Sequence, residues 1–314
     1  MSHAPYRIVY MGTPQFAVPA LEALLAHGEE VVAVVTQPDR PKGRGRKLAP
    51  PPVKEVALAA SIPVLQPKSI KTDAFLAEIA SYRPDLIVVV AFGRLLPGPL
   101  IDLPAHGTIN VHASLLPKLR GAAPIQWSLI NNEPETGVTI MQMDEGLDTG
   151  DILLPGTIPI APDDTAASLA EKLAALGGRL LVEAIDRLKA GNLPPLKQDD
   201  SQATLAPLLC KQEGIIDWQK PAETISGLIR GLDPWPTAST TLDGTPLRLF
   251  APRVVAGEMR EAPGTLCRAD REGLLIATGQ DYLLVGEVQL AGGKRLPVDA
   301  FLRGRPLEPG LRLG

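Results

Sequence analysis

Three residues whose side chains can carry out acid–base chemistry stand out in the middle of the chain. Asn110 and His112 fall in the stretch 108–112, where polar and apolar side chains alternate as in a strand with one face on a core. Residues two apart in a strand point to the same face, so we expect the amide and the imidazole to lie side by side. Asp148 follows in a glycine-rich acidic loop. An amide, an imidazole and a carboxylate that meet in one pocket can move a proton and hold an oxyanion.

The same residues also allow a simpler interpretation. An Asn-x-His pair on a strand is commonly a polar pair with ordinary hydrogen-bond partners, and an Asp between glycines commonly marks a turn. The functional interpretation requires that 108–112 is a strand of an open α/β sheet and that its last residues lie at the edge formed by the carboxyl ends of the strands. Open α/β sheets bind their ligands at that edge.

The elements around these residues predict such a sheet. Buried strands are expected at 7–11, 31–36, 63–65, 85–91 and 136–143, and helices at 14–26, 53–60, 73–82 and 165–189. The run 85–91 is almost wholly apolar, which is typical of a central parallel strand covered on both faces. We expect Gly177 and Gly178 to break the last helix into two. The fold class is therefore α/β, a Rossmann-like, mostly parallel sheet with helices on both faces.

The composition and the first turn exclude several classes of function. Of 314 residues 45% are hydrophobic and 21% charged, which is ordinary for a globular protein, and the net charge is −4, so any contact with RNA must be local. The turn after the first strand lacks G-x-G-x-x-G, and no P-loop occurs, so NAD and ATP are rejected. Two cysteines without metal-site spacing and the lack of an apolar leader or span predict a cytoplasmic protein with neither metal nor membrane contact.

Three motifs together resemble one family. Asn110–Pro117 (NVHASLLP), Arg120–Ile125 (RGAAPI) and Gly146–Gly150 (GLDTG) closely resemble the signature of formyltransferases that use 10-formyltetrahydrofolate, and the resemblance runs from Arg7 through nearly the whole chain. It implies formyl transfer with Asn110, His112 and Asp148 as catalytic residues and with no metal. It also implies a folate site, for which we expect the residues Phe92, Gly93, Ser114, Leu115, Leu116 and Pro117.

A basic segment at 37–48 is a second candidate site. It holds five cations against one acid, Asp39, and its glycines and prolines predict a loop without regular structure. Charge alone fits a solvated loop as well as a phosphate contact. The members of the family that act on aminoacyl-tRNA resemble this chain in carrying such an insertion, which implies a tRNA contact. The cations are Arg40, Lys42, Arg44, Arg46 and Lys47.

The composition changes after the long helix. We expect a catalytic domain that binds 10-formyltetrahydrofolate at 1–190, a polar linker at 191–207 and a β-rich domain at 208–314 with Trp218 and Trp235 in its core. The resemblance implies that the last domain is an OB-like β-barrel that assists tRNA binding.

The resemblance implies transfer of the formyl group to the α-amino group of methionine on initiator methionyl-tRNA. Two other interpretations remain: a formyltransferase for a small or sugar-nucleotide amine, and a formyltetrahydrofolate hydrolase. Both would keep Asn110, His112 and Asp148, but neither has an evident use for the basic segment. No obligatory protein partner is expected.

Overall fold

The computed structural model describes residues 4–42, 47–258 and 260–314 and divides into two compact units. Unit 1 comprises Met1–Ala122, Thr136–Ile158 and Ala170–Ala206, and unit 2 comprises Ala123–Glu135, Pro159–Leu169 and Pro207–Gly314. Two short pieces of the range expected for the catalytic domain, 123–135 and 159–169, therefore cluster with the second unit.

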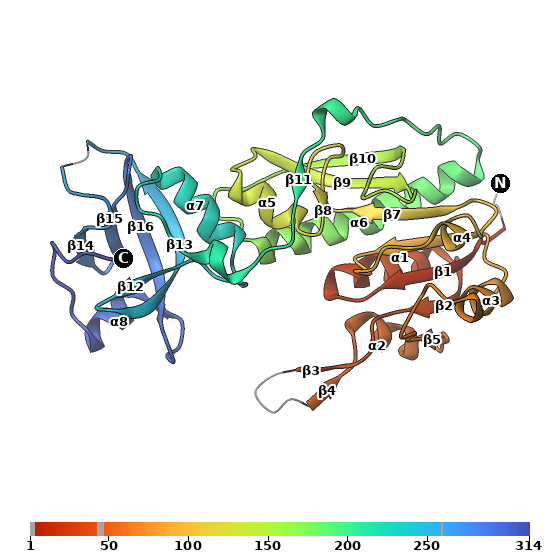
Figure 1. Ribbon diagram of the computed structural model, residues 1–314, viewed down its shortest axis with the longest axis horizontal. Helices are drawn as coiled ribbons and strands as arrows, with labels where there is room; N and C mark the ends of the chain where they lie inside the picture. Colours follow the sequence, from red (N-terminus) through yellow and green to blue (C-terminus); the bar gives the residue numbers. More distant parts are fainter. Residues whose placement is uncertain (1–3, 43–46, 259) are drawn as a thin grey trace. The chain divides into compact units, whose positions relative to one another are not determined.

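Unit 1 is built on a mixed, mostly parallel sheet with the strand order β10-β9-β7-β6-β1-β2-β5 (Figure 1). Its strands are β1 (Arg7–Gly12), β2 (Glu30–Val35), β5 (Val64–Leu65), β6 (Leu86–Val90), β7 (Thr108–His112), β9 (Glu135–Gln142) and β10 (Ile152–Pro159). Strands β5, β2, β1, β6 and β7 pair in parallel, and β9 pairs antiparallel with β7. This sheet confirms the predicted α/β class.

The centre of the sheet follows from its residue types. Every residue of β6 is buried, and Ile8 to Met11 of β1 have no exposed surface. Burying an aliphatic side chain of this size contributes about 2 kcal/mol, so these two strands fix the middle of the sheet. The order of strands reverses between β1 and β6, because β1 leads to β2 on one side while β6 leads to β7 on the other.

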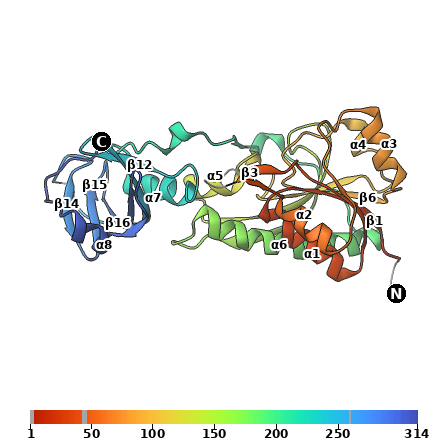
Figure 2. The ribbon, with the colours of Figure 1, turned by 90° about the horizontal axis from the view of Figure 1, so that it is seen from below.

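Helices cover both faces of the sheet (Figure 2). Their bounds are η1 (Gln15–Ala17), α1 (Val18–His27), α2 (Pro52–Ala59), α3 (Asp73–Ser81), α4 (Gly98–Ile101) and α6 (Ala166–Lys189), with η2 (Asp200–Gln202) in the linker. Phe75 and Ile79 of α3 and Leu100 of α4 pack with Val9 and Met11 of β1 on one face. Figure 2 shows α1, α2 and α6 on the other face.

The expected break at Gly177 and Gly178 is wrong, because α6 runs without interruption from Ala166 to Lys189. A Cβ at Gly177 would lie 2.8 Å from Val111 Cγ1, and one at Gly178 would lie 3.0 Å from the carbonyl oxygen of Pro19. The two glycines therefore let α6 approach β7 and α1 closely, and tertiary packing outweighs their low helix propensity.

The basic segment also differs from the prediction of a loop without regular structure. Strand β3 (Arg40–Lys42) pairs antiparallel with β4 (Lys47–Ala49). Asp39, at the base of this hairpin, accepts hydrogen bonds from Lys54 Nζ of α2 at 2.9 and 3.0 Å and from Gln66 Nε2 at 2.8 Å. These bonds tie the hairpin to unit 1.

Unit 2 is an antiparallel β-domain with the strand order β12-β13-β16-β15-β14, and β17 pairs with β16. The strands are β12 (Ser239–Leu242), β13 (Thr245–Val255), β14 (Leu266–Asp270), β15 (Gly273–Ala277), β16 (Tyr282–Leu290) and β17 (Leu296–Pro297). The helices are α5 (Pro124–Ile130), η3 (Lys211–Gly214), α7 (Ala222–Gly231) and α8 (Val298–Gly304). Trp218 is in the core as expected, whereas Trp235 is 51% exposed and that prediction is wrong.

Candidate active site

The candidate site lies at the carboxyl edge of the sheet in unit 1. Strand β7 pairs in parallel with β6, and Val89 stands opposite Asn110. The ends of these neighbouring strands therefore bring Ala91–Gly93 and Asn110–His112 to the same edge, next to the point where the strand order reverses. This is where open α/β sheets bind ligands.

His112 is held between two acceptor groups. Its side chain is almost fully buried, and its Nε2 donates to the carbonyl oxygen of Leu119 at 3.1 Å. Its Nδ1 lies 3.6 Å from Oδ1 of Asp148. A carbonyl oxygen can only accept, so Nε2 carries a proton, while Nδ1 faces the carboxylate of Asp148 beyond hydrogen-bond distance.

The loop that carries Asp148 is shaped by its own polar groups. Asp144 Oδ1 accepts hydrogen bonds from the Gly146 amide at 3.0 Å and from Thr149 Oγ1 at 2.7 Å, an Asx turn. Asp148 has a φ of 53°, which Asp tolerates better than most residues. Its Oδ2 accepts from the Gly121 amide at 2.8 Å, so one carboxylate oxygen is anchored and the other faces His112.

Asn110 lies two residues before His112 on β7 and is half-buried. Residues i and i+2 of a strand share a face, so the amide and the imidazole stand on the same side of the sheet. The structure thus brings together the three side chains that the sequence predicts to be catalytic. His112 and Asp148 face each other at 3.6 Å, and Asn110 lies on the same face of β7 as His112.

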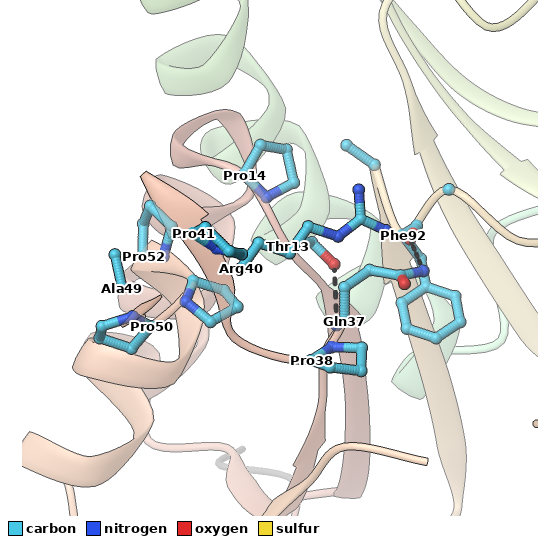
Figure 3. Close-up of a pocket in the computed structure, with 13 residues that line it drawn as sticks. Thr13, Pro14, Gln37, Pro38, Arg40, Pro41, Ala49, Pro50, Pro52 and Phe92 are labelled. Atoms are coloured by element: carbon cyan, nitrogen blue, oxygen red, sulfur yellow. Dashed lines mark hydrogen bonds between the residues drawn. The ribbon is translucent and has the colours of Figure 1, made fainter. Parts of the chain in front are cut away.

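A cavity of about 430 Å³ opens beside this edge (Figure 3). Phe92 and Gly93, two of the expected folate residues, line it together with Thr13, Gln37 and Arg40. Gln37 connects two segments that line the cavity. Its backbone N–H donates to Thr13 Oγ1 at 3.2 Å, and its side-chain Nε2 donates to the Phe92 carbonyl at 3.2 Å. The remaining lining is apolar and rich in proline, namely Pro14, Pro38, Pro41, Ala49, Pro50, Pro51, Pro52 and Ala91.

The other expected folate residues, Ser114 to Pro117, form the turn directly after β7. The Ser114 hydroxyl donates to the Lys118 carbonyl at 2.6 Å, and the Leu116 amide donates to Thr139 Oγ1 at 3.2 Å. Leu116 packs with Met141 and Ile152, while Leu115 and Pro117 are half-buried. These four residues do not line the cavity that Phe92 and Gly93 line.

Three of the expected tRNA contacts, Arg40, Lys42 and Lys47, fall on the strands β3 and β4. Arg40 lines the cavity, and Lys42 and Lys47 are paired opposite each other at the ends of the two strands. Arg44 and Arg46 lie outside the described residues. Hydrogen bonds from Gln66 and Lys54 lower the pKa of Asp39 at the base of the hairpin.

Sequence reasoning missed the linker residues that reach this site. Gln198 Nε2 donates to the carbonyl oxygens of Asp148 at 2.8 Å and Gly150 at 2.7 Å. Thr204 Oγ1 accepts from the Leu119 amide at 2.9 Å. A glutamine and a threonine in a polar linker give no sequence signal of such contacts.

Two family models match most of the chain. The family model described as formyl transferase matches residues 6–185, and the model described as formyl transferase, C-terminal domain, matches residues 209–306. The chain belongs to the formyl transferase family.

Close relatives narrow this class. The methionyl-tRNA formyltransferase of Desulfotalea psychrophila is 57% identical over 298 residues, which is 95% of this chain and 92% of that protein. That of Geobacter sulfurreducens is 54% identical over 312 residues, 99% of this chain and 98% of the relative. Within the family the chain therefore groups with the methionyl-tRNA formyltransferases.

Solved structures share the fold at low identity. HypX from Aquifex aeolicus in complex with tetrahydrofolic acid has a TM-score of 0.65 at 19% identity and covers 99% of this chain and 51% of its own. The N-formyltransferase from Helicobacter canadensis has a TM-score of 0.67 at 19% identity and covers 93% of this chain and all of its own. Among the described residues, no helix has the length and apolar character to cross a membrane.

Proposed function

We propose that this protein transfers the formyl group of 10-formyltetrahydrofolate to the α-amino group of methionine on initiator methionyl-tRNA. The product is N-formylmethionyl-tRNA, which serves translation initiation. The observation that carries the proposal is the His112 imidazole, buried between the Leu119 carbonyl and the Asp148 carboxylate on the strand that also bears Asn110. Membership of the family and the 57% identical relative support the same reaction.

The three side chains divide the chemistry. Attack of the amine on the formyl carbon places negative charge on the formyl oxygen, and the leaving nitrogen of the folate needs a proton. Asn110 donates its amide hydrogen to the developing oxyanion. His112, protonated on both nitrogens, adds positive charge beside that oxygen and passes a proton toward the leaving nitrogen.

Asp148 keeps the imidazole in position for this step. Its carboxylate lies near Nδ1, and the Gly121 amide fixes its second oxygen. Because Nδ1 faces Asp148, the Nε2 proton that meets the Leu119 carbonyl is the one that passes to substrate in this proposal. Asp148 also helps to remove the proton of the attacking amine through water.

The folate site in this proposal uses two segments at the same edge of the sheet. Phe92 and Gly93 offer an apolar wall with backbone polar groups beside the cavity, which suits a flat heterocycle. Ser114, Leu115, Leu116 and Pro117 are assigned to the same site because they follow directly after the catalytic strand.

The tRNA contact in this proposal is the basic segment 37–48 with Arg40, Lys42, Arg44, Arg46 and Lys47. Arg40 and Pro41 of β3 line the same cavity as Phe92 and Gly93, so the proposed tRNA element and the proposed folate wall meet there. Such a meeting point is what a transfer between two bound substrates requires.

The proposed domain roles follow from this arrangement. Residues 1–190 bind the folate and carry the catalytic residues, 191–207 form the linker, and 208–314 assist tRNA binding. Because the acceptor is an aminoacylated tRNA, we place the protein in the cytoplasm. The proposal includes no obligatory protein partner and no membrane contact.

An acceptor competition tests the proposal. The protein is given 10-formyltetrahydrofolate with a labelled formyl group, together with methionyl-tRNA, free methionine, a sugar-nucleotide amine and water as competing acceptors. We expect the label to accumulate on methionyl-tRNA. Label released as formate identifies a hydrolase, and label on the sugar-nucleotide amine identifies a different transferase; either result overturns the proposal.

A further inference from the structure

The linker 191–207 makes specific contacts with two parts of the candidate active site, the loop that carries Asp148 and the segment Leu119–Gly121. Its residues 196–206 all belong to unit 1. Leu196 exchanges two backbone hydrogen bonds of 2.8 Å with Ile152, just after the Asp148 loop. Strand β11 (Leu205–Ala206) pairs in parallel with β8 (Arg120–Gly121), and the Gly121 amide of β8 is the one that anchors Asp148. The linker is thus fixed to the site at both of its ends.

Gln198 makes the central contact. Its neighbours Lys197 and Asp199 are exposed, whereas Gln198 is half-buried. Its amide nitrogen donates to the carbonyl oxygens of Asp148 and Gly150, which brackets the residue between them, Thr149. The amide group is therefore used to its full donor capacity on the loop that carries the carboxylate.

Arg120 fixes the orientation of this amide. Its Nε and Nη2 donate to Gln198 Oε1 at 3.0 and 2.8 Å, and Nη2 also donates to Asp200 Oδ1 at 2.7 Å. The guanidinium is mostly buried. Because an arginine has no acceptor, Gln198 can turn only its oxygen toward Arg120 and must turn its nitrogen toward the Asp148 loop.

Thr204 binds Leu119, the residue whose carbonyl accepts from His112. Leu119, whose carbonyl accepts from His112 Nε2, has a φ of 59° and so occupies the left-handed region, which costs a leucine about 1 kcal/mol. Its amide donates to Thr204 Oγ1, and the Arg120 amide donates to the Thr204 carbonyl at 2.9 Å. The linker thereby stabilises the strained residue that holds the imidazole.

We propose that Gln198, oriented by Arg120, is a positioning residue that holds the Asp148 loop so that the carboxylate faces His112. Asp148 itself sits at a φ of 53°, so its loop needs such external bonds to keep one arrangement. A displacement of about 1 Å in an acid–base pair can cost about 10²-fold in rate, which gives a backbone clamp direct leverage over turnover. This proposal rests on the proposed function, in which Asp148 serves His112.

The test uses the full chain and steady-state formylation of methionyl-tRNA, after the parent protein has been shown to carry out that reaction. A parent without this activity would refute the proposed function and not the role of Gln198. Gln198→Glu keeps the size and the acceptor for Arg120 but removes both donor hydrogens from the loop. Gln198→Met removes the same hydrogen bonds without adding a charge.

We expect each variant to lower kcat about tenfold or more while KM for folate and for tRNA changes less than about threefold. Gln202→Glu is the matched control, because Gln202 is in the same linker and bonds to Asp199, away from the site. It should keep the parent kcat. Adding Gln198→Glu to Asp148→Asn should lower kcat no further, because Gln198 acts through Asp148.

Two results would overturn the proposal. One is a parent-like kcat in both Gln198 variants, which would mean that the loop keeps its arrangement without the clamp. The other is a double variant in which the losses from Gln198→Glu and Asp148→Asn multiply, which would mean that Gln198 acts by another route. Thermal unfolding of each variant separates these results from loss of the fold, and Gln198→Met supplies the comparison should the buried charge of Gln198→Glu unfold the chain.

Discussion

Asn110 and Asp148 have different proposed roles. In the proposed reaction Asn110 stabilises an oxyanion, whereas Asp148 supports the imidazole. Asp148 is bound by the Gly121 amide through one oxygen and faces His112 with the other. The two residues should therefore respond differently to substitution.

Replacing Asp148 by Asn removes the charge that faces His112 and keeps a side chain of the same size. We expect kcat to fall about 10²-fold or more, as for loss of an acid–base partner. The affinity for tetrahydrofolate, measured by calorimetry, should stay within about threefold of the parent. A variant that turns over at the parent rate would contradict the role of Asp148.

Asn110→Ala removes the amide that donates to the oxyanion. Loss of one such donor costs about 10²–10³-fold in kcat. Asn110→Asp is a useful companion, because it keeps the shape but offers an acceptor to a negative oxygen, and its loss should be at least as large. Rates of formylation at saturating substrates measure both, and a full rate in Asn110→Asp would exclude an oxyanion role.

The residues of the candidate site differ in how well the sequence predicts their positions. The period-2 alternation of 108–112 is a local signal, so it correctly places Asn110 and His112 on one face of β7. The approach of Asp148 to His112 depends on contacts far apart in the chain, and only the motif resemblance indicated it. Gln198 lies in a polar linker, and nothing in its neighbours marks it as half-buried.

At the scale of elements, the β3–β4 hairpin depends on a cluster at its base. Asp39 accepts from Gln66 and Lys54, and these bonds lower its pKa. A carboxyl with a lowered pKa in the folded state contributes stability above its unfolded value, and that contribution is lost as the pH falls through the lowered value. The hairpin should therefore loosen in acid.

Hydrogen exchange of the strands β3 and β4 between pH 6 and pH 2.5 measures this loosening. After correction for intrinsic exchange rates, we expect protection to fall below about pH 4, the ordinary range of an Asp carboxyl. Asp39→Asn should show weaker protection at pH 6 and little further change in acid. Equal profiles for the parent and the variant would mean that Asp39 does not hold the hairpin.

The same hairpin is the proposed tRNA contact. Replacing Arg44 and Arg46 together by Ala should weaken tRNA binding and flatten its salt dependence, since each lost phosphate contact removes about 0.7 to 0.9 from the log–log slope. Folate affinity should not change. Lys71 and Arg83 are exposed cations elsewhere in unit 1, so their double replacement is the control for net charge. If both double variants lose the same slope, the hairpin has no special role.

The elements were harder to predict where packing decides. Two adjacent glycines such as Gly177 and Gly178 predict a helix break. In the structure they instead allow α6 to pack closely against Val111 and Pro19. The hairpin was missed because Arg40–Lys42 and Lys47–Ala49 carry no apolar alternation, and their pairing is favoured by the anchor at Asp39. By contrast, the apolar run of β6 is explained by its burial on both faces, so its sequence was sufficient.

At the scale of the whole molecule, all residues of the cavity and of the candidate catalytic site belong to unit 1. The fragment 1–207 should therefore bind tetrahydrofolate with an affinity close to that of the full chain. Circular dichroism first establishes that the fragment is folded, because α5 loses the apolar partners that it has in unit 2. A folded fragment without folate binding in calorimetry would contradict the assignment of the folate site.

We propose that the buried imidazole of His112 carries out the proton transfer of the reaction. Single-turnover formylation, in which saturating enzyme loaded with 10-formyltetrahydrofolate is mixed with a smaller amount of methionyl-tRNA, measures that step apart from product release. We predict that His112→Ala lowers the rate about 10²–10⁴-fold, while His106→Ala, which removes an exposed imidazole stacked on Tyr6, leaves it unchanged. A single-turnover rate in His112→Ala equal to that in His106→Ala would contradict the account.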